Sequence, residues 1–192
     1  EVEPHAAVLS RLRAPEGVVS VLGNHDYCEY NRYGTRDGAR RQLERLISLE
    51  RGMGWRLLLD ESVEVRRGAA AIAVIGVENT GRPPFPARGN LRRAMEGVAD
   101  TTFKILLTHD PSHWRHEVLP ATDVDLTLSG HTHAVQLRIG RFSPARWVYP
   151  EWGGVYREGD RTLHVSVGAG GTVPFRLGAW PEIDIITLRR RK

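Results

Sequence analysis

The sequence has a single cysteine, Cys28, and two lysines, Lys104 and Lys192, among its 192 residues. One cysteine excludes an internal disulfide, and so excludes the small disulfide-stapled folds. No apolar run approaches the about 18 residues that a membrane-spanning helix needs, and the longest, residues 69–77, has the length of a strand. No secretory signal opens the chain, but residue 1 is Glu rather than Met. That absence therefore carries little weight.

What is present is typical of one globular domain, which we place over residues 1–192. Hydrophobic residues make up 41% and charged residues 26%, and the formal net charge is +4. The arginines are scattered among acidic residues, and the only undiluted basic run is residues 189–192. Because clustering rather than total charge marks a nucleic-acid interface, this pattern favours a solvated surface. The terminal run could also contact anionic lipid, so peripheral membrane association stays open.

Hydrophobic periodicity predicts a mixture of helices and strands. Helical spacing of apolar residues occurs over residues 5–13, 37–53 and 90–98. A proline-rich loop is expected at residues 82–86, because prolines interrupt both helices and inner strands. Strand-like runs occupy residues 18–22, 56–59, 62–66, 71–77, 103–108, 124–128, 162–167 and 183–188.

Three of these hydrophobic strands end in a short loop that carries histidine. Residues 18–22 lead into Gly23-Asn24-His25-Asp26, residues 103–108 into His109-Asp110, and residues 124–128 into Gly130-His131-Thr132-His133. Loops at the carboxyl ends of parallel strands meet at one edge of a sheet. We therefore expect these histidines, far apart in the sequence, to be neighbours in space.

Imidazole nitrogens mixed with Asn and Asp oxygens favour borderline to hard divalent ions such as Zn, Mn or Fe. Glycines at 23 and 130 would allow tight turns and close backbone approach. The sequence offers no Cys-x-x-Cys pair and no His-x-x-x-His helix for a zinc site of another kind. The remaining histidines are interpreted as surface or hydrogen-bonded residues: His5, His113, His116 and His164.

The three loops, in this order, resemble the last three motifs of the calcineurin-like metallophosphoesterases. Residues 153–156, 167–170 and 181–183 are similar to the closing segments of the branch with the bacterial phosphodiesterases YkuE and YaeI. The resemblance implies an α/β fold of two facing mixed β-sheets flanked by helices. It also implies two divalent metal ions, about 3.5–4 Å apart, that share a hydroxide attacking phosphorus.

By the same resemblance, Asn24, His109 and His131 would hold one ion and His133 the other. His25 would protonate the leaving oxygen or stabilise the equatorial phosphoryl charge, and Asp26 would orient His25. Arg32 and Arg36 are candidates for binding a substrate phosphate, because the guanidinium fork suits it. The implied substrate is a small phosphodiester or pyrophosphate. Some members of the branch are similar to the pyrophosphatases of lipid A biosynthesis that act on a nucleotide-sugar lipid, UDP-2,3-diacylglucosamine.

The family begins with an Asp-x-His and a Gly-Asp motif, and neither precedes Asn24. Our hypothesis is that the chain is an N-terminally truncated fragment that lacks the first strand or strands, binds one ion weakly and turns over poorly. A nuclease and a non-catalytic metal-binding relative remain alternatives. The expected location is cytoplasmic or at the inner membrane face, or outside the cell if a signal precedes Glu1. The sequence leaves the oligomeric state open.

Overall fold

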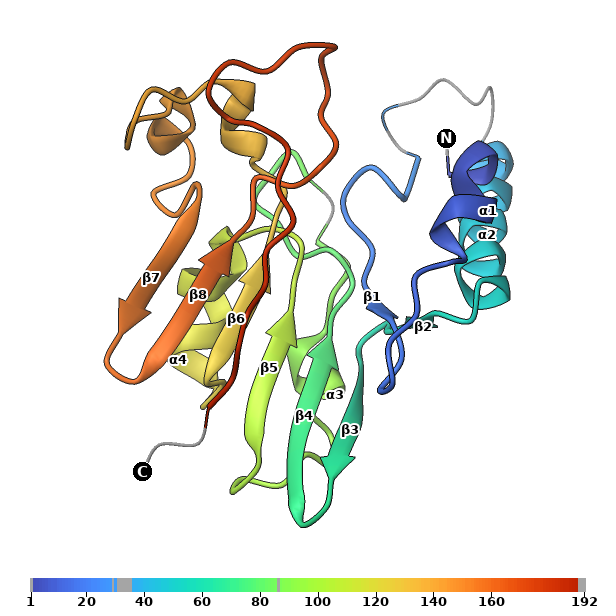
Figure 1. Cartoon of the computed structure of the whole chain (residues 1–192), viewed down its shortest axis with the longest axis vertical. Coiled ribbons are helices and arrows are strands. Elements are labelled where there is room, and N and C mark those ends of the chain that lie inside the picture. Colours follow the sequence, from blue (N-terminus) through green and yellow to red (C-terminus); the bar gives the residue numbers. More distant parts are fainter. Residues whose placement is uncertain (1, 29, 31–35, 86, 190–192) are drawn as a thin grey trace.

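The computed structural model describes residues 2–28, 30, 36–85 and 87–189, and Figure 1 shows the arrangement of their helices and strands. The helical elements are η1 (Glu3–His5), α1 (Ala6–Leu9), α2 (Arg36–Gly52), α3 (Leu91–Ala94), η2 (Trp114–Val118), α4 (Leu119–Ala121), η3 (His133–Gln136) and η4 (Pro144–Trp147). The strands are β1 (Val19–Ser20), β2 (Arg56–Leu57), β3 (Glu61–Arg67), β4 (Ala70–Gly76), β5 (Phe103–Leu107), β6 (Leu126–Ser129), β7 (Gly154–Glu158) and β8 (Arg161–Val165). None of the helices in this described part of the chain is long and apolar enough to cross a membrane.

The strands form a six-stranded mixed sheet and a separate two-stranded sheet. The larger sheet has the order β3-β4-β5-β6-β8-β7. Its four central strands run parallel, and an antiparallel hairpin closes it at each edge. The smaller sheet pairs β1 with β2 in parallel. The carboxyl ends of β5 and β6 therefore lie at one edge, as the loop argument requires.

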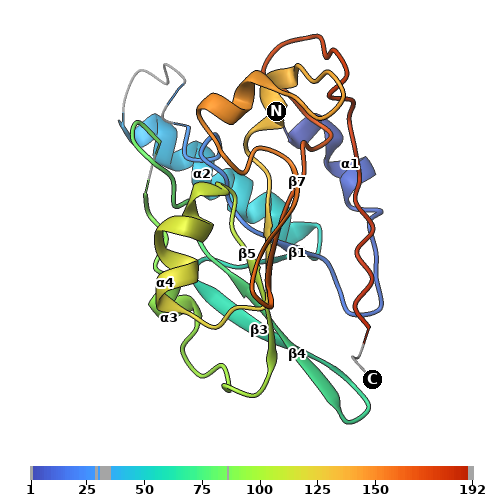
Figure 2. The same cartoon turned by 90° about the vertical axis from the view of Figure 1, so that its left-hand side faces the viewer.

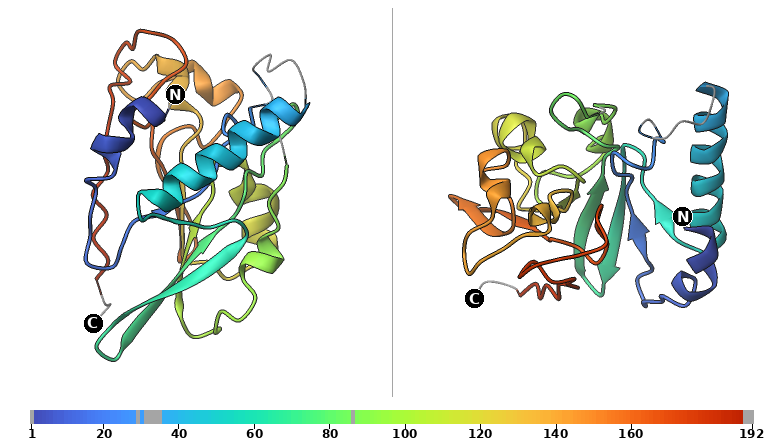
Figure 3. Two further views of the ribbon diagram at one scale, coloured as in Figure 1. Left: turned by 90° about the vertical axis from the view of Figure 1, so that its right-hand side faces the viewer. Right: turned by 90° about the horizontal axis from the view of Figure 1, so that it is seen from above.

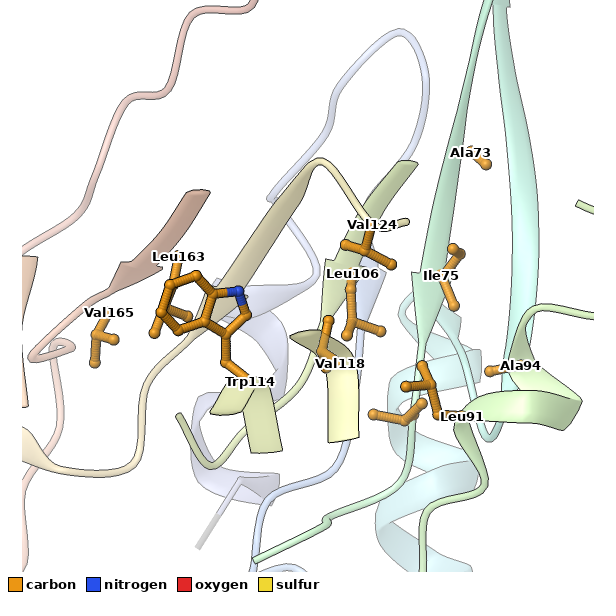
Figure 4. Close-up of a cluster of buried hydrophobic side chains, with 11 residues drawn as sticks. Ala73, Ile75, Leu91, Ala94, Leu106, Trp114, Val118, Val124, Leu163 and Val165 are labelled. Carbon is orange, nitrogen blue, oxygen red and sulfur yellow. The ribbon is translucent and has the colours of Figure 1, made fainter. Parts of the chain in front are cut away.

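One face of the six-stranded sheet is covered by helices. Strand alternation points Ala73, Ile75 and Val77 to this face, where the main core also takes Leu91 from α3 and Trp114 from η2. Figure 4 shows this cluster. In Figure 2, α3 and α4 lie on this side of the strands and the C-terminal segment lies on the other. This core fixes the strand ends that carry the histidines.

Helix α2 forms a second, smaller core with the two-stranded sheet. Its apolar stripe includes Leu43, Leu46 and Ile47, which pack around buried Leu22 and Leu57. Figure 3 shows α1 and α2 on the outer side of β1 and β2, away from the large sheet. This core carries the loop that follows β1.

The predicted α/β fold with two sheets flanked by helices is confirmed, and most strands lie where the periodicity placed them. The helices predicted at residues 5–13 and 90–98 are shorter, as η1 with α1 and as α3. The helical segment of η2 and α4 was not predicted.

The strand predicted at residues 183–188 is wrong. This stretch is extended, but it pairs with no strand in the described part of the chain. Its side chains at Ile183 and Ile185 are 90% and 93% exposed. Periodicity identified a segment suited to a strand, but a strand also needs a neighbour to supply its hydrogen bonds.

Candidate metal centre

A cavity of about 550 Å³ lies where the loops after β1, β5 and β6 meet. Its lining includes every histidine of the three predicted loops: His25, His109, His131 and His133. Asn24 and Asp26 line it as well, together with Phe85 and Tyr149. The three loops thus converge as the strand-end argument predicted.

Three side chains from three loops bring their polar atoms together in this cavity. The Oδ1 atom of Asn24 lies 2.9 Å from Nε2 of His109 and 3.1 Å from Nδ1 of His131. The two ring nitrogens are 3.2 Å apart. The amide of Asn24 donates through Nδ2 to the hydroxyl of Tyr30, at 3.2 Å, which directs Oδ1 toward the histidines. A proton on Nε2 of His109 could be shared between Oδ1 of Asn24 and Nδ1 of His131. A metal cation could instead accept a lone pair from each of the three atoms.

The size of this triangle suits a divalent ion. Ligands at about 2.1 Å from an octahedral ion stand about 3 Å from one another, which matches the three observed separations. No group of three or more His, Cys, Asp or Glu side chains among the described residues forms a metal cage. The residues present therefore fit one face of an ion's coordination shell, made of two imidazoles and one amide.

His109 reaches the triangle because residue 23 is glycine. A Cβ atom at Gly23 would stand 2.7 to 2.9 Å from atoms of the His109 ring, which is closer than side chains pack. Burial, together with neighbouring His131 and His133, lowers the pKa of His109 to about 3. The ring is therefore neutral near pH 7, as a metal ligand must be. A Cβ atom at Gly130 would stand 3.9 Å from its nearest neighbour, so side-chain space there does not require glycine, but the backbone does approach closely, since the Gly130 N–H donates to the carbonyl oxygen of His109 at 3.0 Å.

His131 is oriented by two groups behind it. Its Nε2 lies 2.7 Å from the Tyr149 hydroxyl and 3.6 Å from Oδ2 of Asp110. That carboxylate oxygen is buried and has no hydrogen-bond partner among the residues that the structure describes. Burial lowers the pKa of His131, and Asp110 raises it. A proton on Nε2 would satisfy this side of the ring and leave Nδ1 with a free lone pair facing Asn24 and His109.

His133 occupies the same cavity but takes its orientation from a different segment. Its Nδ1 lies 3.2 Å from the carbonyl oxygen of Val167, an acceptor that also receives a hydrogen bond from Arg176 at 3.1 Å. With Nδ1 donating, the Nε2 lone pair is available for a ligand. Positive φ values at His133, Ala134 and Val135 are unfavourable for L-residues, and such strain concentrates at functional sites.

His25 and Asp26 form the turn after β1. His25 is exposed, lines the cavity and lies beside the Tyr30 ring, with 5.0 Å between centroids. The Asp26 carboxylate accepts a hydrogen bond from the backbone of Gly23 at 2.7 Å, which closes the turn. His25 is therefore placed where a bound molecule could reach it, and its predicted orientation by Asp26 stays a prediction.

The two arginine predictions are untested. Arg32 and the side chain of Arg36 lie outside the described residues. Sequence reasoning missed that Tyr30 and Tyr149 contact Asn24 and His131. No local pattern marks these contacts, since Tyr149 is 18 residues from His131 and Tyr30, though it follows the first histidine loop closely, belongs to no motif. The hydrogen-bonded interpretation of His113 is confirmed, since this buried ring contacts Thr108 and Glu117.

Comparison with known proteins identifies homologues that are named metallophosphoesterases. The chain is 32% identical to the uncharacterized metallophosphoesterase YkuE of Bacillus subtilis, over 96% of this chain and 62% of that protein. It is 29% identical to an uncharacterized metallophosphoesterase of Aquifex aeolicus, over 96% and 65% respectively. A transmembrane protein with metallophosphoesterase domain from Bos taurus is 29% identical, over 95% of this chain and 41% of that protein.

These similarities cover nearly all of this chain but about three-fifths of the length of the bacterial relatives. No family model matches the chain, and neither does any solved structure. The homologues thus support the general class of metallophosphoesterase, which the sequence motifs and the triangle of Asn24, His109 and His131 also indicate.

Proposed function

We propose that the chain is a calcineurin-like metallophosphoesterase that hydrolyses a phosphodiester or pyrophosphate bond. The observation that carries this proposal is the convergence of Asn24, His109 and His131 within 2.9 to 3.2 Å of one another. Homologues named metallophosphoesterases support it independently. It includes the roles given above: one divalent ion, such as Mn, Fe or Zn, at this triangle and a second at His133.

A divalent ion at this position would neutralise phosphate charge and lower the pKa of a bound water. The residues of the chain do the rest. His25 donates a proton to the leaving oxygen, which its exposed place in the cavity allows. Asp26 holds the β1 loop closed by accepting from Gly23. Asp110 and Tyr149 keep the ring of His131 in one orientation.

The finer proposal is that the substrate is a nucleotide-sugar lipid precursor of the kind processed in lipid A biosynthesis. The cavity wall supports it in part. Phe85 and Tyr149 offer aromatic surfaces for a planar group, and Val135 and Val173 offer an apolar side. A substrate of this class would use both surfaces, whereas a small inorganic ester would use neither.

The test is metal content and turnover of the purified chain. Mass spectrometry of the chain loaded with Mn²⁺ should find divalent metal bound to it, and a chain that retains none would contradict the proposal. With Mn²⁺, bis-nitrophenyl phosphate should be hydrolysed in preference to mono-nitrophenyl phosphate. Activity on the monoester alone would contradict the proposed substrate class.

A matched pair of histidine variants separates chemistry from background. His25→Ala should lower kcat by about 10²-fold or more, because a general acid contributes on that scale. His116→Ala removes an exposed histidine outside the cavity and should leave kcat unchanged. Equal activity in the two variants would remove His25 from the mechanism.

A further inference from the structure

Two segments of the chain account for its entire net positive charge of +4. Residues 134–150 and 169–181 contain four arginines and no Asp or Glu, whereas the rest of the chain has 23 basic and 23 acidic residues. None of these arginines is paired with a carboxylate in the described part of the chain. Their positive charge is thus uncompensated locally: Arg138, Arg141, Arg146 and Arg176.

The same two segments expose large apolar side chains, which we call the apical surface. Trp147, Trp180 and Phe175 are 77%, 64% and 63% exposed. The full set is Val135, Ile139, Phe142, Trp147, Val148, Val173, Phe175, Leu177 and Trp180. Soluble proteins rarely gather exposed apolar side chains in this number, and such surfaces mark contact with a partner or a membrane.

The apical surface is one connected structure. Leu137 and Leu177 form a bridge between the two segments, and the buried side chain of Gln136 donates to the carbonyl oxygens of Val173 and Phe175. Within the first segment the Phe142 and Trp147 rings lie 5.8 Å apart. These contacts hold the two segments together, so the backbone that carries the exposed aromatic side chains is fixed.

This surface adjoins the cavity. Val135 and Val173 belong to both, since each is exposed and each lines the cavity. Figures 1 and 2 both show the two segments, in orange and red, at the end of the molecule toward which β5, β6 and β8 point. Whatever binds the apical surface therefore lies at the mouth of the candidate metal centre.

We propose that the apical surface docks on an anionic lipid bilayer, with its Trp and Phe side chains at the headgroup boundary. The positive charge of the four arginines favours a lipid surface over other partners, because arginines without local acidic residues are complementary to anionic headgroups. The side chains agree, since Trp is enriched at membrane interfaces and apolar faces insert by several ångströms. Docking would place the mouth of the cavity against the membrane. The proposal deepens the proposed function but is measured without turnover, so either can fail alone.

Vesicle flotation of the 192-residue chain in EDTA tests it. Vesicles of phosphatidylcholine with about one-third phosphatidylglycerol should bind the chain, and pure phosphatidylcholine vesicles should bind it much more weakly. Arg141→Ala/Arg146→Ala should weaken partitioning by about 30-fold, and Trp147→Ser/Trp180→Ser by about tenfold or more. Tryptophan fluorescence should shift to the blue on binding to anionic vesicles, and this shift should be lost in the tryptophan variant.

Matched controls come from other exposed positions. Ile185→Ser removes a 93% exposed apolar side chain and Arg92→Ala an exposed arginine of α3, and neither should change binding. Circular dichroism should show that all variants keep the fold. Unchanged binding in both apical variants would overturn the proposal, as would loss of binding only on removing residues 189–192. A dimer that Trp147→Ser/Trp180→Ser dissociates without affecting vesicle binding would assign the surface to self-association instead.

Discussion

The two sheets differ in how firmly they hold the residues they contribute to the cavity. The six-stranded sheet rests on a core of eleven buried residues and supplies His109, His131 and His133. The two-stranded sheet rests on a core of three buried residues with half-buried leucines around them, and its loop supplies Asn24, His25 and Asp26. The three imidazoles on the strands of the larger sheet thus come from the strongly packed side, and the Asn24 amide and the proposed general acid, His25, come from the weakly packed one.

The candidate metal centre lies across the junction of these two regions. Tyr27 joins them, because its hydroxyl donates to Glu78 and accepts from the backbone of Asn79, both at 3.1 Å. At Gly76 the strand β4 approaches Leu58 so closely that a Cβ atom there would lie 2.4 Å from the leucine Cβ. The ligand triangle therefore depends on how the junction is held as well as on the ligands themselves.

The largest expected difference between the regions is in stability. Leu106→Ala, in the six-stranded sheet, should lower the free energy of unfolding by about 3 kcal/mol or more, because the side chain is fully buried. Leu46→Ala, on the half-buried stripe of α2, should cost about 1 kcal/mol. Guanidinium titrations of both variants measure this. Equal losses of unfolding free energy in the two variants would show that the two cores are packed equally tightly.

The second prediction concerns the junction itself. Gly23→Ala puts a methyl group against the His109 ring and should destabilise the chain by about 1–3 kcal/mol, while weakening Mn²⁺ binding about tenfold or more. Gly52→Ala is the matched control, since a Cβ atom there meets open space at the end of α2. Calorimetric titration with Mn²⁺ measures the affinity. An unchanged affinity in Gly23→Ala would show that His109 is not a ligand in this position.

The third prediction is acid destabilisation of the metal-free chain. Because burial lowers the pKa of His109 to about 3, the unfolded state binds one more proton than the folded state between about pH 6.5 and 3. Stability should therefore be full above pH 6.5 and fall by about 1.4 kcal/mol per pH unit below it for this histidine. The lowered pKa values of His131 and His133 add to this slope.

Urea titrations in EDTA at pH 7, 6 and 5 measure the slope. His109→Gln should reduce it by the contribution of one proton, because the amide does not titrate. If stability fell with pH equally steeply in the variant, protonation of other groups, and not of His109, would cause the acid destabilisation.

The two regions also differ in how well the sequence predicts them. Periodicity located α2 and the strands β3, β4 and β5 closely, since each buries one regular face. Strand-end loops predicted the convergence of His109, His131 and His133. The partners behind the ligands escaped prediction. Tyr149 lies 18 residues from His131, in a loop without periodicity. The segment at 183–188 has the composition of a strand but pairs with no strand in the described part of the chain, although its Asp184 carboxylate lies 3.3 Å from Nε2 of His164.

The smallest expected effect concerns Tyr149, whose contact with His131 the sequence did not predict. Tyr149→Phe removes the hydroxyl that lies 2.7 Å from Nε2 of His131, so it should cost about 1 kcal/mol of stability and about tenfold in Mn²⁺ affinity. Tyr156→Phe removes a hydroxyl that donates to the backbone of Gly153 and should cost similar stability with no change in affinity. Equal affinity in the two variants would assign Tyr149 to packing alone. A loss confined to Tyr149→Phe would show that the strongly packed region orients its ligands from behind, as the contacts of Asp110 and Tyr149 with His131 indicate.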